Sequence, residues 1–317
     1  MQHRLLAGAL MALVSSPLAA QVTFGISFDA SANGLTADER SRITSHLQEA
    51  GRRWVRMAGT TAVRNIEIEV RVSAIPTASA TSVTTGFVAV VGGRNLFEQG
   101  MAYELRTGVD PNGAAADAIV TFGLAYLRNE LWFDPDPVAR TAEVPANRTD
   151  AMSVALHEIG HALVYNGWAD ITTGQPQPTY WSTFDRWMAP GAPTVFIGAA
   201  ATRSWGSAPD LTTGNNKHWG NTTRFDLPPV PPIIQGPVQW RDGAPMPQPA
   251  CELPPSIDAP PSADTNGPRG GPSLIDELMN GVVFYRGSRY DIGALDRATL
   301  IDTGVIPDRI FSGVFEP

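Results

Sequence analysis

The segment His157-Glu-Ile-Gly-His161 constrains this chain more than any other feature of its sequence. In a helix, residues four apart lie one turn apart on the same face, so both imidazoles point the same way. Neither a strand nor a loop would hold the two rings in this arrangement. The motif therefore requires a helix, and the rest of the fold must pack around it.

The residues on either side of the motif favour that helix. Asp150, or Thr149 before it, is a suitable N-cap residue. Asn166-Gly167 follows the last apolar residues and predicts the end of the helix. A helix over roughly 150–166 is therefore expected.

Two neutral imidazoles at this spacing can bind one tetrahedral zinc ion. Glu158 lies between them in the motif, and its carboxylate is placed to take a proton from a water molecule on the metal. We therefore expect His157 and His161 to be zinc ligands and Glu158 to be a general base. A catalytic zinc site needs a third protein ligand and keeps the fourth position open.

Composition and charge exclude several classes of protein. The chain is 43% hydrophobic and 17% charged, which is an ordinary globular composition with enough apolar residues for a core. Its formal net charge of -8 argues against nucleic acid and anionic membrane surfaces as partners. No apolar run is long enough to predict a transmembrane anchor.

The N-terminus has the pattern of a signal peptide. His3-Arg4 precede an apolar run from Leu5 to Val14, and small residues follow up to Ala19-Ala20. Residues 1–20 are therefore expected to be removed on export, to a secreted or periplasmic location. The single cysteine, Cys251, excludes an internal disulfide and is expected to be a surface thiol in a proline-rich stretch.

The pattern of the remaining chain predicts an α+β fold. Strands are expected over 22–29, 66–75, 85–91 and 119–127, and helices after the capping box at 36–39, over the motif, and near 273–279 and 293–303. The expected architecture is a mixed, twisted sheet packed on the motif helix.

Two subdomains are expected after the signal peptide. Residues 21–167 would form an N-terminal catalytic subdomain with the motif helix. Residues 168–317 would form an irregular, loop-rich C-terminal subdomain, with an extended proline-rich segment over 228–272.

Few residues can be the third ligand. Without His3, the two unassigned histidines are His46 and His218. His46 flanks an apolar stripe on the first helix and is expected to be a surface or boundary residue, whereas His218 lies in a turn-rich loop suited to a ligand from a second subdomain. A carboxylate is the alternative. Of the downstream glutamates, Glu252 lies among prolines and Glu277 is the credible competitor.

The order of three motifs resembles a known family. They are His157-Glu-Ile-Gly-His161, then His218-Trp219, and later Asp276-Glu-Leu-Met279. In this order they resemble the leishmanolysin-like branch of the metzincin metallopeptidases, in which an inserted segment separates the third histidine from the helix. The resemblance spans about residues 150–305, and its tail, 292–305, resembles the helix that follows the Met-turn. The chain has Val164 where the family has glycine, so Gly167 is expected to make the helix-ending turn.

The resemblance implies a metzincin-like fold and a zinc endopeptidase that acts on proteins or peptides. It implies His157, His161 and His218 as the ligands of one zinc ion, Glu158 as the general base and Met279 as the methionine beneath the metal. Two alternatives stay open: a non-catalytic exported protein that binds zinc or captures a ligand, and a zinc hydrolase in which Glu277 is the third ligand.

Overall fold

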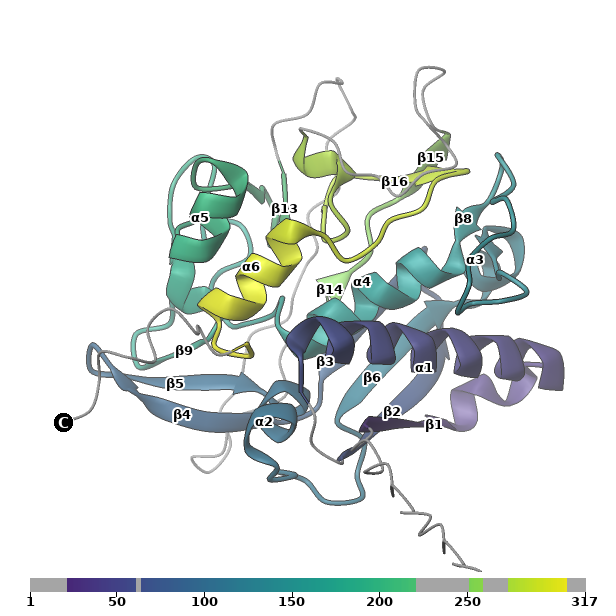
Figure 1. Cartoon of the computed structure of the whole chain (residues 1–317), viewed down its shortest axis with the longest axis horizontal. Coiled ribbons are helices and arrows are strands. Elements are labelled where there is room, and N and C mark those ends of the chain that lie inside the picture. Colours follow the sequence, from purple (N-terminus) through teal and green to yellow (C-terminus); the bar gives the residue numbers. More distant parts are fainter. Residues whose placement is uncertain (1–21, 61–63, 221–250, 259–272, 307–317) are drawn as a thin grey trace, which may run out of the picture.

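The computed structural model describes residues 22–60, 64–220, 251–258 and 273–306 (Figure 1). Helices and sheets are mixed along this part of the chain, and the fold is α+β as expected. The expected signal peptide and most of the proline-rich segment lie outside the described residues. In the described part, no helix is both long enough and apolar enough to cross a membrane.

A mixed five-stranded sheet forms the centre of the molecule. Its strands, in spatial order, are β1 (Val22–Phe28), β2 (Arg64–Ser73), β6 (Ala118–Gly123), β3 (Ala78–Ser82) and β14 (Cys251–Glu252). The first three run parallel, whereas β3 runs antiparallel to β6 and β14 antiparallel to β3. Alternation explains β2, because Ile66, Ile68 and Val70 are fully buried while the residues between them are partly exposed.

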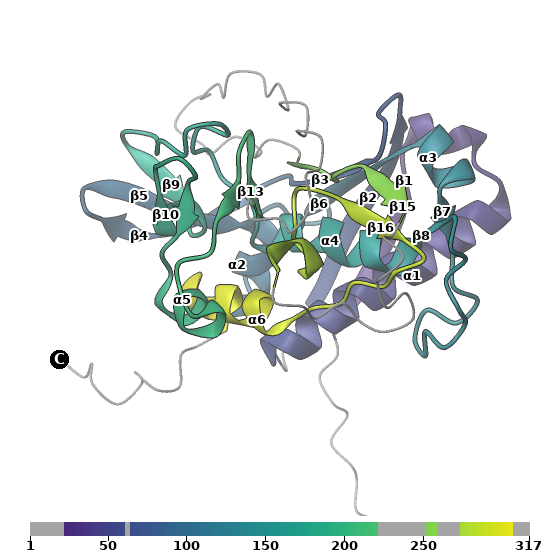
Figure 2. The same cartoon turned by 90° about the horizontal axis from the view of Figure 1, so that it is seen from above.

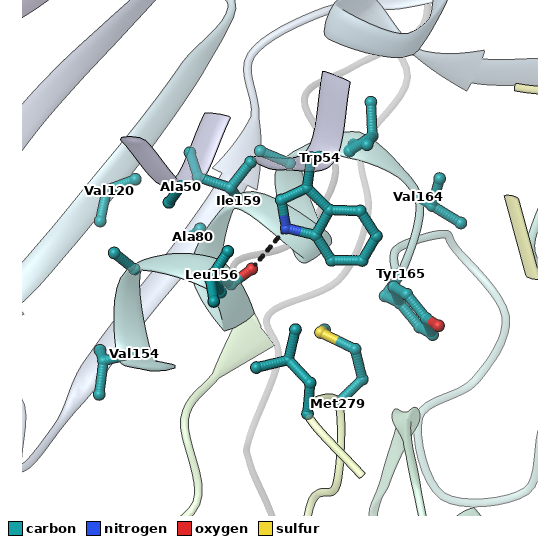
Figure 3. Packing of buried hydrophobic residues seen from close by; sticks show 14 of the residues in the cluster. Ala50, Trp54, Ala80, Val120, Val154, Leu156, Ile159, Val164, Tyr165 and Met279 are labelled. Atoms are coloured by element: carbon teal, nitrogen blue, oxygen red, sulfur yellow. Dashed lines mark hydrogen bonds between the residues drawn. The ribbon is translucent and has the colours of Figure 1, made fainter. Parts of the chain in front are cut away.

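Two helices pack side by side on one face of this sheet: α1 (Ala37–Ala58) and α4 (Ala151–Leu163). The predicted capping box at the start of α1 is confirmed, since Thr36 and Glu39 bond to each other's backbone N–H. Trp54 of α1 donates its ring N–H to the backbone oxygen of Leu156 in α4, at 2.8 Å (Figure 3). This buried hydrogen bond, together with the packing of the Trp54 ring, fixes α1 against α4.

The other elements are short. A second sheet contains β4 (Thr85–Val91), β5 (Arg94–Gln99) and β9 (Tyr180–Ser182). Paired short strands are β7 (Leu131–Trp132) with β8 (Thr149–Asp150), β10 (Met188–Ala189) with β11 (Val195–Phe196), β12 (Leu211–Thr212) with β13 (Asn215–Trp219), and β15 (Ser256–Asp258) with β16 (Phe284–Arg286). The remaining helices are α2 (Gly100–Thr107), α3 (Leu124–Asn129), α5 (Ala199–Trp205), α6 (Ala294–Asp302) and the 3-10 helices η1 (Ala30–Gly34), η2 (Asp185–Trp187) and η3 (Leu274–Asp276). One buried apolar cluster contains residues from both expected subdomains.

Expectations for three segments outside the motif helix differ from the structure. The strand expected over 119–127 ends at Gly123, where the backbone passes close to the oxygens of Ile75 and Thr77, and α3 follows. Only Leu274–Asp276 is helical in the segment expected to form a helix over 273–279. Cys251 is buried and not a surface thiol, because its segment joins the central sheet as β14.

Candidate metal centre

The α4 helix carries the motif near its C-terminal end. Asp150 caps its first turn by accepting from the backbone N–H of Ser153, at 3.1 Å, which confirms the predicted N-cap. The helix ends at Leu163, because Val164 adopts φ -143° and ψ -48°. The expectation that Gly167 makes this turn is therefore wrong: a residue with ordinary negative φ ends the helix.

His218 reaches the helix from β13, 57 residues beyond His161. The backbone N–H of Trp219 donates to the oxygen of Met279 at 2.8 Å, and that of Gly281 to the oxygen of Trp219 at 3.0 Å. These bonds hold β13 against the segment around Met279. Figure 2 shows β13 and α4 approaching each other near the middle of the molecule.

Three imidazole nitrogens meet at this point. The Nε2 atoms of His157 and His161 are 3.0 Å apart, those of His161 and His218 are 2.9 Å apart, and those of His218 and His157 are 3.1 Å apart. A tetrahedral zinc ion with bonds of about 2.0–2.1 Å would separate its nitrogen ligands by about 3.3 Å. The triangle is therefore slightly tighter than a zinc site and has the right shape for one.

The hydrogen bond of the other ring nitrogen, Nδ1, determines which tautomer each imidazole adopts. Nδ1 lies 2.8 Å from the oxygen of Leu278 in His157, 2.8 Å from that of Tyr165 in His161, and 3.2 Å from that of Asn215 in His218. A carbonyl only accepts, so each Nδ1 carries the proton and donates it. Each Nε2 then presents a lone pair toward the other two. Such lone pairs repel one another, and a shared cation removes that repulsion.

The three rings are fully buried, and their electrostatics suit metal binding. Burial lowers the pKa of His161 to about 4. Burial, followed by the neighbouring imidazoles, lowers the pKa of His157 and His218 well below the usual range. All three rings are therefore neutral at pH 7, which is the form that binds a metal ion.

Glu158 is also fully buried, and neither of its carboxylate oxygens has a hydrogen-bond partner among the described residues. Burial, followed by the charge of Glu252, raises the pKa of Glu158 well above its usual range. A buried carboxylate without partners is costly. Water or a substrate group beside it would satisfy these oxygens.

Met279 packs against the motif helix at Gly160. A Cβ added to Gly160 would come within 2.6 Å of the sulfur of Met279, so Gly160 allows this close packing. Figure 3 shows Met279 on the same side of the helix as Tyr165, near the ring of Trp54. Leu278, just before it, supplies the carbonyl that orients His157. The segment therefore contacts both the motif helix and one of its histidines.

The competing ligands lie elsewhere. Glu277 has a carboxylate oxygen near Gly293, and burial, followed by the charges of Asp296 and Asp276, raises its pKa. It does not belong to the histidine cluster found among the described residues. His46 is likewise outside this cluster. The expectation that His46 is a surface or boundary residue is wrong, because it is 2% exposed and its ring packs edge-on against Phe133.

Several residues that support the site were not identified from the sequence. The carbonyls that orient the histidines have no sequence signal, since every residue has a carbonyl group. A buried ion pair joins Lys217, next to His218, to Asp185. The two partners lie 32 positions apart in the sequence, so no local pattern indicated the pair.

Comparison with known proteins gives no match to this chain among family models, curated proteins or solved structures. The residues of the site therefore carry the evidence for function.

Proposed function

We propose that this protein is an exported zinc-dependent endopeptidase. The observation that carries the proposal is the triangle of three buried Nε2 atoms, from His157, His161 and His218, with the unpartnered carboxylate of Glu158 in the same helix. The donor set is one that zinc favours, and three ligands leave a fourth position open. A structural zinc site would not need a base beside it.

The role of each residue follows from its chemistry. A bound zinc ion supplies a Lewis acid that lowers the pKa of a water molecule and polarises a carbonyl group. Glu158 takes the proton of the attacking water on a carboxylate oxygen and delivers it to the leaving amine. The carbonyls of Leu278, Tyr165 and Asn215 hold the three imidazoles in the tautomer that leaves Nε2 free.

The resemblance to leishmanolysin-like metzincins supports the same proposal. The order of HExxH, His218-Trp219 and Glu277-Leu-Met279 matches that branch, and the mixed sheet beside the motif helix agrees with a metzincin-like arrangement. In this proposal Met279 is the methionine beneath the metal, packed against Gly160.

One observation favours a second candidate, a non-catalytic zinc-binding protein. The three histidines and Glu158 are all fully buried. A peptide can therefore reach the centre only if the chain that covers it moves aside. If no such opening occurs, the bound metal would stabilise the fold and would not act on a substrate.

Removing the metal separates these candidates. Treatment with a zinc chelator should abolish peptide cleavage and lower the melting temperature, because three facing lone pairs would remain without a cation. One equivalent of Zn²⁺ should restore both properties. We would measure zinc content, melting temperature and cleavage of a mixed peptide library on the same samples. A zinc-loaded protein that cleaves nothing would contradict the endopeptidase and support the second candidate.

The proposed export has its own test. N-terminal sequencing of the protein from the medium or periplasm should find Gln21 or Val22 as the first residue, because the apolar run ends before a small-residue cleavage site. Active protein that retains Met1 would contradict export by this route.

A further inference from the structure

Five oxygen-bearing side chains gather at the end of the central sheet where β2 and β6 begin. They are Glu67 on β2, Glu104 on α2, Asp110 and Asn112 in the loop after α2, and Asp117 just before β6. Figure 1 shows α2 and this loop at that end of the sheet. None of the five belongs to the histidine cluster.

Three of these side chains are close enough to bind one ion. Glu104, Asp110 and Asp117 each offer a carboxylate oxygen, and these atoms all lie within 4.8 Å of one another. Two oxygens bound to the same Ca²⁺ ion at 2.3–2.6 Å can be at most about 5 Å apart. The three oxygens therefore meet the distance limit for a shared calcium ion.

Two of the carboxylates are buried and incompletely satisfied. Asp117 is fully buried; its Oδ2 accepts from the backbone N–H of Glu67 at 2.9 Å, and its Oδ1 has no partner among the described residues. Glu104 is 4% exposed, and its Oε2 likewise lacks a partner in that part of the chain. Buried carboxylate oxygens without partners are costly, so these atoms point to a bound group.

Two further side chains of this region, Glu67 and Asn112, also have a buried oxygen. Glu67 accepts from the side-chain amide of Asn65 with Oε1, and its buried Oε2 has no described partner. Asn112 donates its amide N–H groups to the oxygens of Ala115 and Ala116, at 3.0 and 2.9 Å, and its buried Oδ1 has no described partner either. In both side chains one end is fixed and one oxygen remains available.

The loop fixes Asp110 in a similar way. Its Oδ1 accepts from the backbone N–H groups of Asn112 and Gly113, at 2.9 and 2.7 Å. Gly113 has φ +65°, a conformation that favours glycine. The carboxylate of Asp110 is therefore held at the mouth of the cluster, where it is exposed to solvent.

The charge of the cluster is unbalanced. Among the described residues, four carboxylates lie near one cation, Arg64, whose Nε donates to the backbone oxygen of Glu104 at 3.3 Å. Burial, followed by the charges of neighbouring carboxylates, raises the pKa of Glu104 to about 7. Burial likewise raises the pKa of Asp117 to about 8, with contributions from Glu104 and Glu67. These groups need either protons or a cation.

We propose that Glu67, Glu104, Asp110, Asn112 and Asp117 form a Ca²⁺ site that joins β2, α2 and the start of β6. All the donors are oxygens, which selects a hard cation over zinc. Calcium accepts six to eight oxygens in flexible geometry, whereas magnesium requires an octahedron and keeps several waters. The site is separate from the histidine centre and independent of the proposed peptidase activity.

Equilibrium dialysis of the full, zinc-loaded chain against ⁴⁵Ca²⁺ tests this site. We expect one Ca²⁺ per chain, with a dissociation constant no weaker than roughly 1 mM, the range of extracellular calcium modules. Asp110→Asn keeps the acceptor for the turn and removes one charge, so affinity should fall about tenfold or more. For Asp117→Asn the Ca²⁺ affinity should fall further. Glu69→Gln, on the same strand as Glu67 but outside the cluster, should bind as wild type does.

Melting temperature gives a second readout that does not depend on peptide cleavage. CaCl₂ at about 5 mM, above that affinity range, should raise the melting temperature of the wild type and of Glu69→Gln by several degrees, and MgCl₂ should raise it less. Asp110→Asn, altered at an exposed position, should fold and show a smaller shift. The proposal is overturned if the wild type binds no Ca²⁺ at this concentration, or if Asp110→Asn and Asp117→Asn both bind it as tightly as the wild type.

Discussion

Glu158→Gln should lower kcat/KM for peptide cleavage by about 10²–10⁴-fold while one zinc ion stays bound. Glutamine has the same shape as glutamate and cannot accept the proton of the attacking water. The three imidazoles that hold the metal are unchanged, so zinc content should match the wild type. Cleavage assays and metal analysis on the same preparation would measure both quantities.

A matched control makes this result specific. Glu277→Gln makes the same chemical change at a half-buried carboxyl outside the histidine cluster. Burial raises the pKa of this carboxyl to about 8. It should keep wild-type cleavage and zinc content. Near-normal cleavage by Glu158→Gln would show that another group is the base. An equal loss in both variants would show that general damage to the fold, and not a lost proton acceptor, lowers the activity.

Local patterns predicted the elements whose residues carry their own signal. The alternation of Ile66, Ile68 and Val70 predicted β2, and the capping box at Thr36 predicted the start of α1. Both signals depend on neighbours in the sequence. The alternation arises from burial of one face of the strand, whereas the capping box arises from hydrogen bonds between exposed residues at the start of the helix.

Pairing between distant segments was not predictable in this way. The β3 segment, Ala-Ser-Ala-Thr-Ser, has no strong apolar alternation, yet Ala78 and Ala80 are buried where α4 packs on the sheet. Small side chains there leave room for the helix. Cys251 pairs with Ala80, and nothing near Cys251 indicates a partner so far away in the sequence.

The two candidate metal sites also differ in how much of their signal is local in the sequence. The spacing of His157 and His161 is a helical signal, so two of the three histidines of the centre are readable from five consecutive residues. The calcium cluster combines Glu67 of β2, Glu104 of α2 and Asp117, which precedes β6, and no spacing relates them. Its signal is physical: buried oxygens without partners, which exist only once the chain has folded.

His218→Ala should weaken zinc binding by more than about 100-fold. Changes to residues that only support a ligand typically weaken binding by about 10–100-fold, and loss of a ligand should weaken it more. His218 supplies one of three nitrogens about 3 Å apart, and two imidazoles alone do not define a tetrahedral site. Competition with a chromogenic chelator would measure the affinity. Circular dichroism of the metal-free protein would distinguish a lost ligand from a lost fold.

Two controls test whether this effect belongs to the position. His46→Ala removes a buried imidazole outside the cluster, and Glu277→Gln removes the competing carboxylate; both should keep wild-type zinc affinity. Near-normal affinity in His218→Ala, together with a large loss in Glu277→Gln, would assign the third ligand to the carboxylate. A loss confined to His218→Ala would instead show that β13 carries the third ligand across 57 residues of chain, held there by its backbone bonds to the Met279 segment.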